Sequence, residues 1–140
     1  MQDIVLFLQQ HWMLCAALVV VVVLLTILEL IKIKQGGERL SPAQVTNLIN
    51  HSDAVIVDVR PTETFTTGHI IDAVSMPIAK FEEKIKKLEK FKSRPIVVVC
   101  AMGNESPKAA VLLKQQGFQT YILSGGIRGW RESEMPVVKG

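Results

Sequence analysis

The feature that most constrains this chain is an uncharged apolar run near its N-terminus. Residues 12–28 read WMLCAALVVVVVLLTIL, and the next three residues extend the run to about the 20 residues that a helix needs to cross a bilayer. A helix is the single-segment structure that satisfies its own backbone hydrogen bonds in lipid. We therefore expect a transmembrane anchor helix at residues 12–31, preceded by a short segment at residues 1–11.

A cleaved signal peptide is the alternative for this run, and its flanks argue against it. A signal peptide has a positive n-region, whereas residues 1–11 carry Asp3 and no Lys or Arg. Lys32, Lys34 and Arg39 follow the run, so the positive-inside rule places the C-terminal side in the cytoplasm. We therefore predict a single-pass protein of the inner membrane, with the N-terminus outside and the remaining chain in a reducing compartment.

The rest of the chain is predicted to be a linker at residues 32–39 and one domain at residues 40–138. SPAQ at 41–44 is a capping-box pattern with a proline in the first helical position, which predicts a helix start. The apolar runs AVIVDV at 54–59 and PIVVVC at 95–100 are typical of strands buried on both faces of a parallel sheet. Shorter strands are expected at AVSM (73–76) and QTYIL (119–123).

Helical patterns separate these strands. After the turn AMGNE, Ser106 can cap a helix that has Pro107 in its first position and ends at Gly117. Strands and helices thus alternate along the domain. The predicted fold class is α/β, an open, mostly parallel sheet with helices on both faces.

The net charge of +3 does not indicate a nucleic-acid-binding protein, because acidic residues are interspersed among the basic ones. In KFEEKIKKLEKFKSR at 80–94, lysines alternate with glutamates, and Phe81, Ile85, Leu88 and Phe91 recur at helical spacing. This pattern predicts an amphipathic helix with a solvated charged face. A basic surface that touches anionic lipid is the alternative.

Cys100 is the candidate reactive residue, since it ends an apolar strand and begins a glycine-containing turn. In open α/β sheets, ligands lie beyond the carboxyl ends of strands. The N-terminus of the next helix favours an anion there, and Gly103 allows the backbone to curl so that its N–H groups face inward. Cys100 is therefore either a nucleophile held as a thiolate or a small buried residue that closes the strand.

Three segments resemble the signatures of the rhodanese family. VIVDVRPTETFTTGHIIDAVSMPI at 55–78 resembles the first signature, with Asp-x-Arg after a strand, then Glu and Gly-His-Ile. YILSGGIRGW at 121–130 is similar to the C-terminal signature, and CAMGNES lies between the two where the family carries its active-site loop. The resemblance covers about residues 38–138 and implies a single-domain, membrane-anchored member of the rhodanese-like sulfurtransferases.

This resemblance implies that Cys100 accepts a sulfane sulfur and holds it as a persulfide. The residues expected to surround the sulfur with backbone N–H donors and to bind substrate are Ala101, Met102, Gly103, Asn104, Glu105 and Ser106. Asp58 and Arg60 are expected to join the site's surroundings by polar contacts, with Arg60 also a candidate substrate guide. His69 is expected to support the site by organising a turn. No metal-ligand spacing occurs, and no cofactor is expected.

The loop departs from parts of the family in two ways. Asn104 and Glu105 stand where many thiosulfate-using members carry Arg or Lys, and Ser106 stands where phosphatase relatives carry the arginine that holds phosphate. The leading hypothesis is a sulfurtransferase that moves sulfur from a sulfane-sulfur donor to a thiol acceptor and uses thiosulfate poorly. The alternative is a membrane-anchored protein-binding or redox-sensing module with a membrane-protein partner.

Overall fold

The computed structural model describes residues 1–31 and 37–140 with their side chains. The side chains of residues 32–36 lie outside this description, among them Lys32 and Lys34, on which the predicted membrane orientation depends. The chain divides into two compact units, Met1–Lys34 and Gln35–Gly140.

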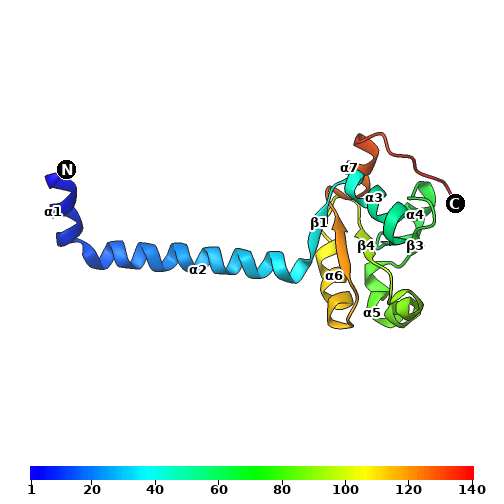
Figure 1. Ribbon diagram of the computed structural model, residues 1–140, viewed down its shortest axis with the longest axis horizontal. Helices are drawn as coiled ribbons and strands as arrows, with labels where there is room; N and C mark the ends of the chain where they lie inside the picture. The colour runs from blue at the N-terminus through cyan, green and yellow to red at the C-terminus, as the bar shows by residue number, and fades with distance from the viewer. The chain divides into compact units, whose positions relative to one another are not determined.

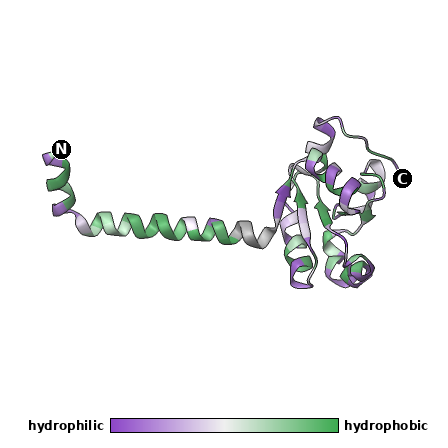
Figure 2. Cartoon of the chain, viewed as in Figure 1, coloured by the Kyte–Doolittle hydropathy of each residue, from purple (hydrophilic) through white to green (hydrophobic). Residues whose placement is uncertain are grey.

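The first unit contains helix α1 (Gln2–Gln10) and most of helix α2 (Trp12–Gly36). Within α2, the stretch Trp12–Ile31 is long and apolar enough to cross a membrane, judged by its length and composition. Figure 2 shows hydrophobic residues along most of the length of this helix. Cys15 lies near its start and is a free cysteine.

The second unit alternates strands and helices, as Figure 1 shows. Its elements, in chain order, are β1 (Glu38–Leu40), α3 (Pro42–Ser52), β2 (Val55–Asp58), α4 (Thr62–Thr67), β3 (Val74–Ser75), η1 (Ile78–Lys80), α5 (Phe81–Lys84), η2 (Ile85–Phe91), β4 (Ile96–Val99), α6 (Ser106–Gln115), β5 (Thr120–Leu123) and α7 (Gly126–Glu132).

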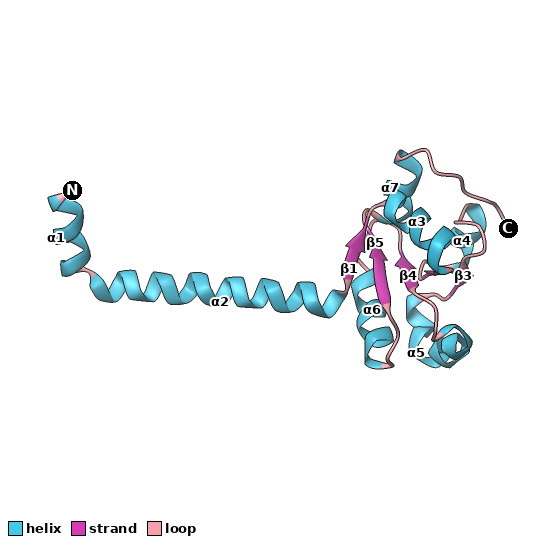
Figure 3. Ribbon diagram, viewed as in Figure 1, coloured by secondary structure: helices cyan, strands magenta, loops and turns pink.

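The five strands form one parallel sheet in the order β1-β5-β4-β2-β3 (Figure 3). The four strands predicted from the apolar runs are confirmed, and β4 is the central one. Strand β1 was not predicted, and its first two residues, Glu38 and Arg39, lie in the segment expected to be a linker at 32–39. The sequence gives no sign of this strand because Glu38 and Arg39 are polar. The strand is recognised only by its backbone pairing with β5.

Helices cover both faces of the sheet, which confirms the predicted α/β class. On one face, Phe81, Leu88 and Leu113 from α5, η2 and α6 pack on the strands. On the other face, Val45 from α3 and Trp130 from α7 pack on them. Strands covered on both faces require the near-continuous apolar runs seen in β2 and β4, which are fully buried.

The start of α3 follows the predicted capping box. The Ser41 hydroxyl accepts the Gln44 backbone N–H, and the Gln44 side chain accepts the Ser41 backbone N–H. The segment predicted as one amphipathic helix at 80–94 is helical but not a single α-helix. It is α-helical over α5 and 3-10 over η2, and only Phe81 and Leu88 of its apolar residues are fully buried.

The predicted cap of α6 is wrong by one residue. Ser106 is the first residue of the helix, the N-cap position is Glu105, and no side chain caps it. The physical reason is burial: the Ser106 side chain has no exposed surface and does not turn back to the free N–H groups. The helix ends as expected, since Gly117 follows it at φ +87°.

Candidate active site around Cys100

Cys100 is the residue that follows the central strand β4. It is a free cysteine with only 2% of its surface exposed. Because the sheet is parallel, the turns after β2, β4 and β5 lie at the same edge, beyond the carboxyl ends of the strands. Cys100 therefore lies where an open α/β sheet binds ligands. We call residues 100–106 the cysteine loop.

The thiol sulfur accepts a backbone hydrogen bond within this loop. The Gly103 N–H donates to Cys100 Sγ at 2.9 Å, across a turn in which Gly103 has φ +92°. This φ is readily adopted by glycine and strained for other residues. A backbone N–H aimed at the sulfur stabilises negative charge there, on a thiolate or on a persulfide.

A cavity of about 300 Å³ lies beside Cys100. Its lining residues are Arg60, Pro61, Thr64, Cys100, Ala101, Met102, Asn104 and Glu105. The expected loop residues other than Gly103 and Ser106 thus line the cavity, while Gly103 and Ser106 are buried. Sequence reasoning missed Pro61 and Thr64, because only the pairing of β2 with β4 places the turn after β2 beside the cysteine.

Asp58 and Arg60 form a buried ion pair beside the cavity. Arg60 Nε lies 2.9 and 3.0 Å from the two Asp58 carboxylate oxygens, and Arg60 Nη2 lies 2.7 Å from Oδ2. Arg60 Nη2 also donates to the Gly68 carbonyl oxygen at 2.8 Å. These bonds account for the burial of both charges and make Arg60 a tie between β2 and the end of α4.

The start of α7 is hydrogen-bonded to the backbone of the cysteine loop. The Ile127 N–H donates to the Cys100 carbonyl oxygen at 2.8 Å, and the Arg128 N–H donates to the Ala101 carbonyl oxygen at 3.1 Å. Gly126 lies so close that an added Cβ would be 2.3 Å from the Cys100 carbonyl oxygen. The sequence signal for this contact is the glycine pair Gly125-Gly126 within the segment YILSGGIRGW.

Comparison with known proteins shows the family of this domain. Residues 41–133 match the family model described as the Rhodanese-like domain. The chain belongs to the rhodanese-like family. Over 142 residues it is 30% identical to protein YibN of Escherichia coli (strain K12), which covers 100% of this chain and 99% of YibN.

Two further relatives cover the rhodanese-like domain. The thiosulfate sulfurtransferase GlpE of Pseudomonas savastanoi pv. phaseolicola is 40% identical over 95 residues, which are 67% of this chain and 87% of that protein. The crystal structure of a rhodanese-related protein from Thermoplasma volcanium has a TM-score of 0.68 and 31% identity, and the match covers 74% of this chain and 99% of that one. The resemblance seen in the sequence is thus confirmed for family and fold.

His69 of this rhodanese-like domain is outside the cavity lining. Its Nδ1 lies 2.9 Å from the Phe65 carbonyl oxygen, and its ring stacks on Phe65 at a centroid distance of 3.9 Å. Its backbone pairs with Val138. These contacts organise the turn after α4. Among the described side chains, no group of three His, Cys, Asp or Glu residues forms a metal site.

One cation of the rhodanese-like domain reaches the cysteine loop from β1. Both terminal nitrogens of Arg39 lie 3.4 Å from the Gly103 carbonyl oxygen. Arg39 and Gly103 are 64 residues apart in the sequence, and β1 itself was not predicted. No local pattern could have linked the two residues.

Proposed function

We propose that this protein is a membrane-tethered sulfurtransferase that carries sulfane sulfur on Cys100. The observation that carries the proposal is the hydrogen bond from the Gly103 N–H to Sγ of Cys100, a residue that lines the cavity. A donor placed on the sulfur stabilises the charge that the reaction needs, in the way that an oxyanion hole does. Membership of the rhodanese-like family supports the same reaction.

The transfer takes place in two displacements. The Cys100 thiolate attacks the outer sulfur of a donor R–S–SH, the donor's S–S bond breaks, and R–S⁻ leaves. The enzyme then carries Cys100–S–SH, whose outer sulfur loses its proton in the hydrogen-bonding environment of the loop. After reprotonation, an acceptor thiolate R′–S⁻ attacks that sulfur, forming R′–S–SH and restoring the Cys100 thiolate. Electrons and atoms balance without an external oxidant.

The cavity favours neutral or singly charged donors over thiosulfate. Glu105 adds a carboxylate to the lining, and the one lining cation, Arg60, is already paired with Asp58. Pro61, Ala101 and Met102 add apolar surface. A dianion meets about twice the repulsion from Glu105 that a monoanion meets. We therefore propose a low-molecular-weight or protein-bound persulfide as the donor and a thiol as the acceptor.

The tether is the apolar stretch Trp12–Ile31 of α2. The basic residues that follow it favour an inner-membrane protein whose rhodanese-like domain faces the cytoplasm. Protease treatment of intact cells tests this topology: the domain should stay protected until the membrane is opened. Digestion from outside would contradict the orientation and the reducing environment that it implies.

The decisive experiment on the reaction measures the mass of the full chain in detergent after incubation with a glutathione persulfide donor. The wild type and Cys15→Ser should each gain one sulfur atom that glutathione or another thiol removes. Cys100→Ser should gain none, because serine is a poor nucleophile at neutral pH. A protein that never gains sulfur would favour the second candidate, a membrane-anchored binding or redox-sensing module, which the burial of Cys100 and the carboxylate of Glu105 support.

A further inference from the structure

Arg39 connects the strand that follows α2 to the loop that carries the nucleophile. Its two terminal nitrogens share the Gly103 carbonyl oxygen as acceptor, each at 3.4 Å. The position for a Cβ at Gly103 lies 3.2 Å from Arg39 Nη1, so the guanidinium packs directly against the turn. A Cβ at residue 103 would force the guanidinium to shift by a few tenths of an ångström.

Both backbone polar groups of Gly103 are therefore hydrogen-bonded. Its N–H donates to Cys100 Sγ at 2.9 Å, and its carbonyl oxygen accepts from Arg39. In a planar trans peptide, the Gly103 carbonyl and the Asn104 N–H point in opposite directions. A cation on the carbonyl polarises this peptide and strengthens its N–H as a donor. Asn104 lines the cavity beside Cys100.

The other arginines at the loop are paired with carboxylates. Arg60 is held by the buried Asp58, and Arg128 pairs with Glu132 at 3.1 Å on the surface while its Nη1 also lies 3.7 Å from Met102 Sδ of the loop. Glu105 adds negative charge to the cavity. Arg39 makes no ion pair with a described side chain, so its charge acts on the loop without neutralisation by a carboxylate.

We propose that Arg39 is a positioning residue for the cysteine loop. It holds the Gly103 turn and supplies a positive charge that the loop's own sequence lacks. The proposal rests on the proposed function, since its purpose is to stabilise the sulfur anion on Cys100. It also makes β1 part of the active site.

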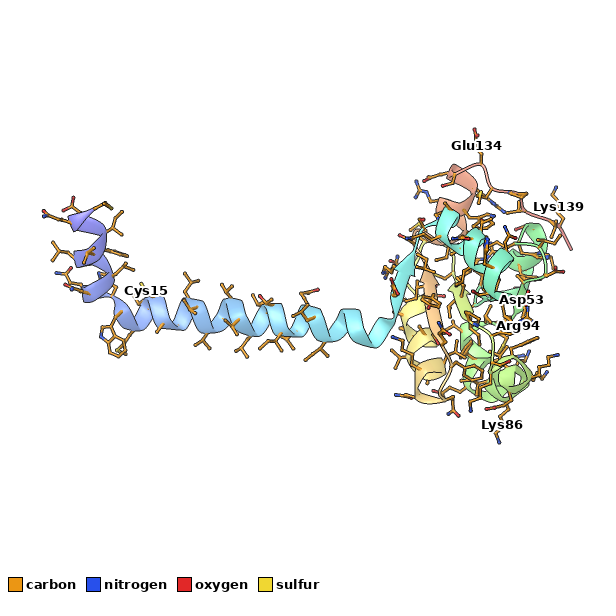
Figure 4. The ribbon with its side chains drawn as sticks, viewed as in Figure 1. Cys15, Asp53, Lys86, Arg94, Glu134 and Lys139 are labelled. Carbon is orange, nitrogen blue, oxygen red and sulfur yellow. The ribbon has the colours of Figure 1, made fainter. Side chains whose placement is uncertain are left out.

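The test compares Arg39→Gln and Arg39→Lys in a Cys15→Ser background, using the full chain in detergent. Arg94→Gln is the matched control. Like Arg39, Arg94 donates to a backbone carbonyl distant in sequence: its Nε lies 2.6 Å from the Asp53 carbonyl oxygen. This bond lies before the amino end of β2, at the opposite end of the strand from the cysteine loop. Figure 4 shows the two labelled residues side by side. The readouts are the rate of Cys100 alkylation by iodoacetamide against pH, the rate of persulfide gain, and the melting temperature.

Arg39→Gln should slow alkylation at neutral pH by about threefold, as expected when a unit positive charge that favours the thiolate is removed from a solvated loop. Persulfide gain should slow by at least the same factor. Arg39→Lys should keep most of the wild-type profile, because the ammonium can still donate to the carbonyl. Arg94→Gln should alkylate like the parent at every pH.

An unchanged alkylation profile in Arg39→Gln would overturn this inference, and so would an equal shift in Arg94→Gln. Alkylation does not depend on any sulfur donor. If the parent never gains sulfur while Arg39→Gln still shifts the profile, the proposed function fails and the role of Arg39 on the loop stands.

Discussion

Replacing Gly126 by alanine tests whether α7 sets the position of Cys100. Gly126 has φ +59°, and a Cβ there would lie 2.3 Å from the Cys100 carbonyl oxygen and 2.8 Å from the Ala101 carbonyl oxygen. Both obstacles are backbone atoms, so no side chain can rotate away. The cysteine loop and the start of α7 must move apart instead.

The matched control is Gly117→Ala. Gly117 has a similar positive φ of +87°, but an added Cβ there meets only the flexible end of Lys92, at 3.6 Å. Both variants therefore carry the cost of a left-handed alanine, about 1–2 kcal/mol. Only Gly126→Ala adds backbone overlap, about 1–3 kcal/mol as for an overpacked core. It also weakens two hydrogen bonds, from Ile127 and Arg128, at about 0.5–1.5 kcal/mol each.

These contributions predict that Gly126→Ala lowers the free energy of unfolding by about 2–6 kcal/mol more than Gly117→Ala does. The assay is urea unfolding of the full chain in detergent, followed by the fluorescence of Trp130 in a Trp12→Phe background. Where Gly126→Ala remains folded, its Cys100 should react more slowly with a persulfide donor, because the loop that presents the sulfur has shifted. Equal losses of stability in the two variants would refute the reasoning that α7 packs against the loop backbone.

Three other predictions concern charges and an unpaired hydroxyl. Glu105→Arg should raise thiosulfate turnover at low ionic strength by about tenfold, with a smaller gain for a neutral persulfide; equal gains would mean that the charge acts on the thiol and not on the substrate. Asp58→Asn should lower the free energy of unfolding by about 3–5 kcal/mol, because Arg60 would remain buried without its partner, whereas Glu132→Gln, which opens an exposed ion pair, should cost less than about 1 kcal/mol. Ser106→Ala should change stability by less than about 0.5 kcal/mol, since the buried hydroxyl has no hydrogen-bond partner among the described residues; a large loss would show that it makes a bond.

Local patterns determined much of the domain. The runs around β2 and β4 predicted buried parallel strands because a strand covered on both faces has no polar side to display. Ser41 and Gln44 predicted the start of α3 because capping is settled within four residues. The same reasoning placed Cys100 at the end of a strand, ahead of a turn with Gly103. These features depend on neighbours in the chain, so the sequence by itself was sufficient for them.

Only the tertiary structure decided how the cysteine loop is held. Strand β1 exists because β5 pairs with it, and its residue Arg39 reaches a loop 64 positions away. Gly126 acquires its role from the backbone of Cys100, against which it packs. Parallel strands bring together turns that are far apart in sequence, and their contacts follow from strand order and register. No local pattern encodes strand order, which is why Cys100 and Gly103 could be singled out from the sequence and the contacts made by Arg39 and Gly126 could not.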